Sequence, residues 1–171
     1  DITVIAASGA RVVGEGIWTY GEASEITEVQ PNFGQKGTRV RIAGTILQGG
    51  GGSVLTVLLA GTEAVIVDQS GTVVNVVAQT STPVVGGVVL IADSGAVVSL
   101  ESGWTYEQEG EASSIEPSSG QVGTSVTISG ASLKGHGRYI EEIYLGGVAA
   151  TIVSREPDPV ACTFCDVDCG D

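Results

Sequence analysis

The chain contains no methionine, a single histidine and no cysteine before Cys162. Basic residues are also scarce, because 7 Lys and Arg stand against 20 Asp and Glu and give a formal net charge of −13. A surface with this charge repels phosphate backbones, so we expect no nucleic-acid partner. No apolar run reaches the roughly 18 residues that a transmembrane helix needs, so we expect no membrane span.

Helical patterning is missing as well. No segment carries apolar residues at helical spacing between capping residues. Val, Ile, Thr and Gly dominate instead, with Gly alone numbering 26, which is typical of short strands joined by tight turns. Segments 38–44 and 124–130 alternate strictly between residues expected to face a core and residues expected to face solvent. The sequence therefore predicts an all-β protein.

The sequence repeats itself at a fixed spacing of 86 residues. Trp18-Thr19-Tyr20 recurs as Trp104-Thr105-Tyr106 (104 − 18 = 86), and Pro31 recurs as Pro117 (117 − 31 = 86). Internal periodicity of this kind is typical of arrays of stacked or strung units.

The repeat divides the chain into one complete unit and two partial ones. We assign residues 25–111 to the complete unit and residues 1–24 to the last strands of another repeat. Residues 112–171 are the first strands of a third repeat and end in a cysteine-containing tail. Since the first residue is Asp and no signal peptide is visible, we expect a processed or excised product.

The two partial units are nearly complementary. Asp1 aligns with Gly87 (1 + 86), and Asp171 aligns with Val85 (171 − 86). The N-terminal piece therefore supplies almost what the C-terminal piece lacks, and we expect each chain to complete its neighbour.

The complete unit also carries a recognisable motif. Its residues are Ile26, Val29, Pro31, Gly34, Gly37, Thr38, Val40, Ile42 and Gly44, then Leu59-Ala60-Gly61, Ala64 and Gly103-Trp104-Thr105-Tyr106. This pattern resembles the IPT/TIG repeat. The resemblance implies tandem immunoglobulin-like (IPT/TIG) β-sandwiches, here one complete and one split between the two chain ends. It also implies a spacer or adhesive role, in an extracellular or cell-surface location, rather than a reaction.

The three cysteines, Cys162, Cys165 and Cys169, all lie within the last ten residues. In one extended strand, Cys162 and Cys165 would lie about 10 Å apart on opposite faces, which is too far for a disulfide. A turn before Cys169 would bring it back to either of them, so we expect one local disulfide whose partners stay open. Zinc binding is the alternative, but a zinc site needs two further ligands, and the one histidine, His136, lies in a distant loop.

Catalytic and cofactor-binding motifs are missing. His136 has no nucleophile signature near it, and the glycine run 49–52 lacks the Lys-Ser/Thr and helix of a phosphate-binding loop. We therefore expect no enzyme activity and no cofactor. Thr80, Ser81 and Thr82 are candidate sites for O-linked glycans, and a plain polar turn is the alternative.

The partial units predict how the chain assembles. Residues 1–20 supply two strands that cannot bury an apolar face alone, and residues from about 113 onward leave half a core exposed. Donor-strand addition between molecules corrects both defects. The contact is head-to-tail, so it propagates into a fibre unless it closes into a ring. We predict a structural subunit of an extracellular filament with itself as partner; the alternative is a fragment of a longer cell-surface array, acting as an adhesion or spacer module.

The repeat also predicts the contact residues. On the donor segment they are Ile2, Val4, Trp18 and Tyr20. On the acceptor segment they are Val126, Ile128, Ile143, Leu145 and Ile152. Within the complete unit, the residues predicted to face the core are Val40, Ile42, Leu59, Ile66, Trp104 and Tyr106.

Overall fold

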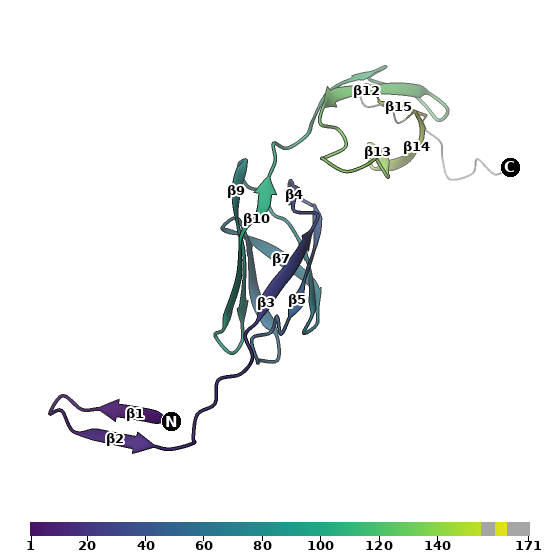
Figure 1. Ribbon diagram of the computed structural model, residues 1–171. Coiled ribbons are helices and arrows are strands. Elements are labelled where there is room, and N and C mark those ends of the chain that lie inside the picture. The colour runs from purple at the N-terminus through teal and green to yellow at the C-terminus, as the bar shows by residue number, and fades with distance from the viewer. Residues whose placement is uncertain (155–159, 164–171) are drawn as a thin grey trace.

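The computed structural model describes residues 1–154 and 160–163, and its regular elements over these residues are all strands, as the sequence predicts. The strands are β1 (Ile2–Ile5), β2 (Arg11–Gly14), β3 (Glu25–Gln30), β4 (Phe33–Gly34), β5 (Arg39–Thr45), β6 (Val54–Leu59), β7 (Thr62–Gln69), β8 (Val73–Val77), β9 (Val84–Ala92), β10 (Val97–Tyr106), β11 (Glu111–Glu116), β12 (Ser125–Ala131), β13 (Ile143–Leu145), β14 (Val148–Ser154) and β15 (Val160–Thr163). They form an N-terminal hairpin, a central sandwich and a C-terminal unit (Figure 1).

The central unit is a sandwich whose two layers share β7. One layer has the order β3-β5-β8-β7, and the other has the order β7-β6-β9-β10-β4. The first residues of β7 pair with β6, and the later residues pair with β8. Strand β7 therefore connects the layers, and the sandwich encloses one core.

The core contains the side chains that the alternation places inside. Val40, Ile42, Leu59, Trp104 and Tyr106 are fully buried, and Ile66 is half-buried against them. The rings of Trp104 and Tyr106 meet edge to face, with centroids 5.6 Å apart. Each large apolar side chain removed from water contributes roughly 1.5–3 kcal/mol. The inward assignment of these residues is confirmed.

Strand β4 of the sandwich was not predicted from the sequence. Strand β4 is two residues long, too short to show alternation, and it pairs in parallel with the end of β10. The Thr105 N–H donates to the Asn32 carbonyl at 2.9 Å, and the Glu107 N–H donates to the Gly34 carbonyl at 2.7 Å. These bonds fix the place where the chain leaves the sandwich.

The C-terminal unit repeats the first part of this topology. Its strand order, β11-β12-β15-β14-β13, corresponds to β3-β5-β8-β7-β6. The register agrees too, because Val126 pairs with Cys162 as Val40 pairs with Val76. The offset of 86, which aligns Cys162 with Val76 (162 − 86 = 76), thus agrees with the strand register. Cys165 and Cys169 lie outside the described residues, so the disulfide remains a prediction.

The N-terminal hairpin has the register of the last two strands of the repeat. Strand β1 pairs with β2 from Ile2↔Gly14 to Ile5↔Arg11. Adding 86 to each number gives the pairs Val88↔Leu100 and Ile91↔Val97, which β9 and β10 form. The hairpin therefore folds locally in the register it would need inside a sandwich.

Trp18 and Tyr20 lie beyond the end of β2, although the sequence placed them in a strand. In the central unit, Trp104 and Tyr106 pair with the first residues of β9, Gly86 and Val84. Among the described residues, the hairpin pairs only Ile2–Ile5 with Arg11–Gly14, so Trp18 and Tyr20 have no strand partner there. The two rings nevertheless meet edge to face at 5.8 Å, as their counterparts do.

We expect the free energy of unfolding of the central unit to decrease as the pH rises above about 10, the ordinary pKa of tyrosine. Burial raises the pKa of Tyr106, and the Gln79 backbone and the Thr62 side chain offset part of this effect. The native state keeps this proton at a pH where the unfolded chain loses it, so stability falls with rising pH. Denaturant unfolding between pH 8 and 11 measures the effect, and Tyr106→Phe should flatten the dependence.

Candidate functional site

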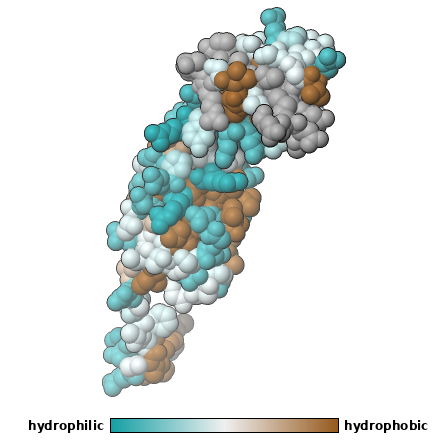
Figure 2. Space-filling view, turned by 90° about the vertical axis from the view of Figure 1, so that its right-hand side faces the viewer, coloured by the Kyte–Doolittle hydropathy of each residue, from teal (hydrophilic) through white to brown (hydrophobic). Residues whose placement is uncertain are grey.

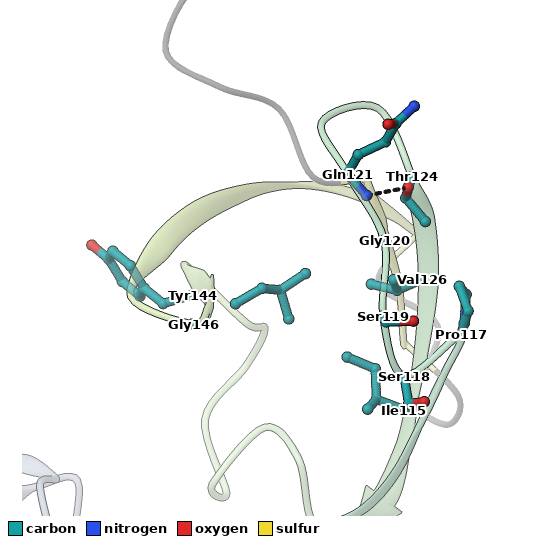
Figure 3. A pocket seen from close by; sticks show the side chains of 11 residues that line it. Ile115, Pro117, Ser118, Ser119, Gly120, Gln121, Thr124, Val126, Tyr144 and Gly146 are labelled. Atoms are coloured by element: carbon teal, nitrogen blue, oxygen red, sulfur yellow. Dashed lines mark hydrogen bonds between the residues drawn. The ribbon is translucent and has the colours of Figure 1, made fainter.

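The most distinctive feature of the C-terminal unit is an open groove of about 370 Å³. Ile115 and Val126 line one side of it, and Tyr144 and Leu145 line the other. Figure 3 shows Val126 and Tyr144 on separate ribbons, with the pocket between them. The groove is open to solvent, and its lining combines these apolar side chains with the polar residues Ser118, Ser119, Gln121 and Thr124.

The central unit shows what fills such a groove. There, Leu59 at the end of β6 pairs with Val88 of β9, and the Ala60 N–H donates to the Gly87 carbonyl at 2.8 Å. The counterpart of β6 is β13, which pairs only with β14 among the described strands. The groove thus lies where a complete unit holds β9 and β10.

The predicted acceptor residues surround this groove with incomplete burial. Val126 is buried, whereas Ile128, Ile143, Leu145 and Ile152 are half-buried. Ile42, Val57 and Leu59, the counterparts of Ile128, Ile143 and Leu145, have no exposed surface, whereas Ile66, the counterpart of Ile152, is half-buried too. The difference marks the part of the core that the C-terminal unit lacks.

The predicted donor residues are also more exposed than their counterparts in the complete unit. Ile2, Val4, Trp18 and Tyr20 are 43%, 59%, 56% and 87% exposed. Their counterparts, Val88, Leu90, Trp104 and Tyr106, are at most 1% exposed. In Figure 2, hydrophobic residues gather on the hairpin at the lower end of the molecule.

The structure therefore groups the predicted donor residues on one part of the chain and the predicted acceptor residues on another. The donor residues belong to the hairpin segment, and the acceptor residues surround the groove of the C-terminal unit. These lie at opposite ends of the central sandwich (Figure 1). No described contact joins them within one molecule, so their pairing remains a prediction.

Ile115 and Tyr144 are among the groove residues that the sequence interpretation missed. Ile115 aligns with Val29 (115 − 86), which packs against the core of the complete unit, so the repeat offset was sufficient to find it. Tyr144 replaces Leu58 and is exposed at the rim. Its hydroxyl donates to Glu142 at 2.9 Å, and this hydrogen bond and the carboxylate charge raise the pKa of Tyr144.

The remaining predicted features lie away from the groove. Thr80 and Thr82 are exposed between β8 and β9, and Ser81 is half-buried there with its hydroxyl 3.2 Å from that of Thr62. Nothing in the structure tests whether they carry sugar. Within the described residues, no three His, Cys, Asp or Glu side chains are arranged to hold a metal ion. The described part of the chain contains no helix of the length and apolarity that crossing a bilayer requires.

Comparison with known proteins agrees with the architecture. Residues 111–166 match the family model of the IPT/TIG domain. The extracellular region of plexin A4, domains 1 to 10, is 20% identical with a TM-score of 0.56 over 83% of this chain and 12% of the plexin chain. A surface glycan-binding protein of Prevotella bryantii is 15% identical with a TM-score of 0.40 over 85% of this chain and 37% of its own. No curated protein sequence matches the chain.

The chain thus spans a small part of each of these larger proteins, and the likeness concerns the fold. The family match covers the C-terminal unit, and the shared strand order extends the same architecture to the central unit. Residues 111–166 thus carry the IPT/TIG match, and the central and C-terminal units are immunoglobulin-like units with the same strand order.

Proposed function

We propose that the protein is a structural subunit that polymerises head-to-tail, with the N-terminal hairpin of one molecule filling the C-terminal groove of the next. The observation that supports this most strongly is the register of the isolated hairpin. It equals that of β9–β10, the pair of strands whose counterparts are missing beside β13. The hairpin therefore has the strand pairing of the two strands that are missing beside β13.

The repeat specifies how the two parts would pair. In the central unit, Val57 pairs with Leu90 and Leu59 pairs with Val88. Shifting these positions by 86 makes Ile143 of the acceptor face Val4 of the donor and Leu145 face Ile2. All four side chains are apolar, and none of them is fully buried in the single chain. Pairing would cover both surfaces and satisfy the free edge of β13.

The occupant is expected to be a second copy rather than the chain's own hairpin. The hairpin and the groove lie at opposite ends of the central sandwich, and the ten residues 15–24 are all that link β2 to β3 (Figure 1). Every molecule therefore offers one donor and one acceptor facing in opposite directions. Such a heterologous contact generates filaments, or rings when the rotation closes.

The setting that we propose for this polymer is the cell surface or the extracellular space, in a structural and non-catalytic role. Support comes from the IPT/TIG match and from the fold shared with the plexin A4 extracellular region. The same fold also suits a module in a longer covalent array, where the preceding repeat would own the hairpin. Assembly of the isolated chain distinguishes the two roles.

An aspartate at position 145 tests the proposal. Leu145→Asp should abolish assembly, because a carboxylate would be buried against Ile2 of the incoming hairpin without a partner. Val153→Asp is the matched control, since Val153 lies on neighbouring β14 but is 64% exposed and points away from the groove. Sedimentation and negative-stain microscopy measure the outcome.

Two results would contradict the proposal. One is assembly of Leu145→Asp at the wild-type level, and the other is a wild-type chain that stays monomeric at high concentration. The second result would favour the covalent array. Circular dichroism establishes that each variant keeps its strand content. Ile143→Asp, one pair further along β13, provides an independent substitution should Leu145→Asp disturb folding.

A further inference from the structure

We infer that the filament has two kinds of joint in alternation: a joint inside each molecule in which Gln35 and His136 contact the linker, and a joint between molecules in which Gln121 and Ser24 make the polar contacts. The inference rests on the proposed function, because the second joint exists only when the hairpin fills the groove. It assigns a role in that second joint to Gln121, whose side chain lies outside the groove that its backbone helps to line.

The joint inside the molecule is held at two points. The Gly110 N–H donates to Gln35 Oε1 at 2.9 Å, which ties the linker to the central unit. The His136 ring nitrogen Nε2 lies 2.9 Å from the Gln108 carbonyl oxygen, which ties the C-terminal unit to the same linker. Gly135 packs against Gln35 as well, so both units and the linker meet at one place.

The first of these contacts has a complete counterpart between molecules. Gln121 aligns with Gln35 (121 − 86), and both have the same local geometry. The Gln35 N–H donates to the Thr38 hydroxyl at 3.1 Å, and the Gln121 N–H donates to the Thr124 hydroxyl at 2.9 Å. Figure 3 shows the Gln121 carboxamide extending away from the groove, and the side chain is exposed.

The hydrogen-bond donor for Gln121 is supplied by the linker of the incoming molecule. Ser24 aligns with Gly110 (110 − 86). The Ser24 hydroxyl donates to the Ile46 carbonyl at 2.7 Å, and a Cβ at Gly110 would meet the equivalent carbonyl of Ser132. The two linkers therefore lie alike against the units that follow them. With the hairpin in the groove, the Ser24 N–H of the donor reaches Gln121 Oε1 of the acceptor.

The second contact, which the His136 ring makes, is absent from the joint between molecules. The loop that carries His136 is repeated around Gly50 (136 − 86), with the same backbone hydrogen bonds. Gly49 donates to Ile46 and Gly51 to Gln48, each at 2.8 Å, as Gly135 donates to Ser132 and Gly137 to Lys134. Glycine at position 50 has no side chain to reach the Glu22 carbonyl, the equivalent of that of Gln108. The joint between molecules thus lacks the imidazole contact, and its linker is tied to the following unit by the Ser24 hydroxyl, which donates to the Ile46 carbonyl.

Gly50 is also a position where the missing contact can be introduced. Its φ of 75° is close to the 65° of His136, which shows that histidine adopts this conformation in the same loop. A Cβ added at Gly50 meets no atom within 4 Å. Gly50→His should therefore add the imidazole contact to the joint between molecules, and the filament should become stiffer.

The test is the persistence length of filaments in electron micrographs at one salt concentration. Gln121→Ala should shorten it at least twofold relative to wild type, and Gly50→His should lengthen it. Gln108→Ala is the matched control, because Gln108 contributes its carbonyl group and the substitution retains it. All three positions are exposed or half-buried in the single chain, so folding should be preserved.

The outcomes separate this inference from the proposed function. Filaments of Gln121→Ala and Gly50→His with wild-type persistence length would overturn the alternating joints while leaving hairpin exchange intact. A wild-type chain that forms no assembly at all would overturn the proposed function and this inference with it. A persistence length that Gln108→Ala shortens as much as Gln121→Ala does would also count against the specific role of Gln121.

Discussion

Deleting residues 1–20 is expected to yield a monomer with an intact central unit and no filaments. The deletion removes all four predicted donor side chains, of which Trp18 and Tyr20 are more than half exposed in the single chain. It leaves the central sandwich untouched, because the buried core residues lie between Ile26 and Val126. Sedimentation should give one species with the mass of the shortened chain, and thermal unfolding of the central unit should be unchanged.

A peptide comprising residues 1–24 should then restore what the deletion removed. Added in equimolar amount, it should bind the shortened chain once and cap its groove, since each large apolar side chain buried contributes roughly 1.5–3 kcal/mol. Trp18 fluorescence should shift to shorter wavelength as the ring leaves water. Polymerisation of the shortened chain, or a Trp18 that stays solvent-exposed in the assembled state, would show that the hairpin does not fill the groove.

Substituting the two tryptophans separately should produce two different defects. Trp104 has no exposed surface, so Trp104→Ala should lower the free energy of unfolding of the central unit by about 3–5 kcal/mol. That is a large share of the roughly 5–15 kcal/mol by which domains are stable. Thermal or denaturant unfolding of the shortened chain, which lacks residues 1–20, measures this effect without interference from assembly.

Trp18→Ala should instead leave the monomer unchanged and weaken assembly. The same side chain would be lost from the completed unit, so a penalty of about 3–5 kcal/mol corresponds to roughly 100- to 4,000-fold weaker association. The concentration at which filaments appear measures the change. Equal stability loss in the monomer for both substitutions would contradict the assignment of Trp18 to a second molecule, and so would normal assembly of Trp18→Ala.

Much of the fold was predictable because its signals are local and repeated. Alternation identified the inward residues Val40 and Ile42, and the constant offset of 86 identified Cys162 as the equivalent of Val76. Both predictions agree with the strand register. The hairpin could be identified in the same way, since its pairing needs only residues close together in sequence. The two-residue strand β4 could not, because it forms only where β10 arrives beside it.

The sequence predicted several residues of the candidate site but not the shape of the site. The offset named Leu145 and Ile2, but it could not show that a groove of about 370 Å³ opens beside β13. It also could not show that Trp18 and Tyr20 lie outside any strand. Those residues need partners from the start of β9 and from β4, and the hairpin has neither.

The sequence by itself determined the all-β character, the repeat and its length, and the inward faces of the strands. It also determined the apolar residues of the donor and acceptor segments at the two ends of the chain. These properties follow from side-chain periodicity and from identities at fixed spacing, which do not depend on distant contacts. Only the tertiary structure decided that the hairpin and the groove lie at opposite ends of the sandwich, and that Gln35 and His136 meet the linker at one joint. Such relations depend on how layers pack and where the chain leaves them, because residues far apart in sequence become neighbours only after the core has formed.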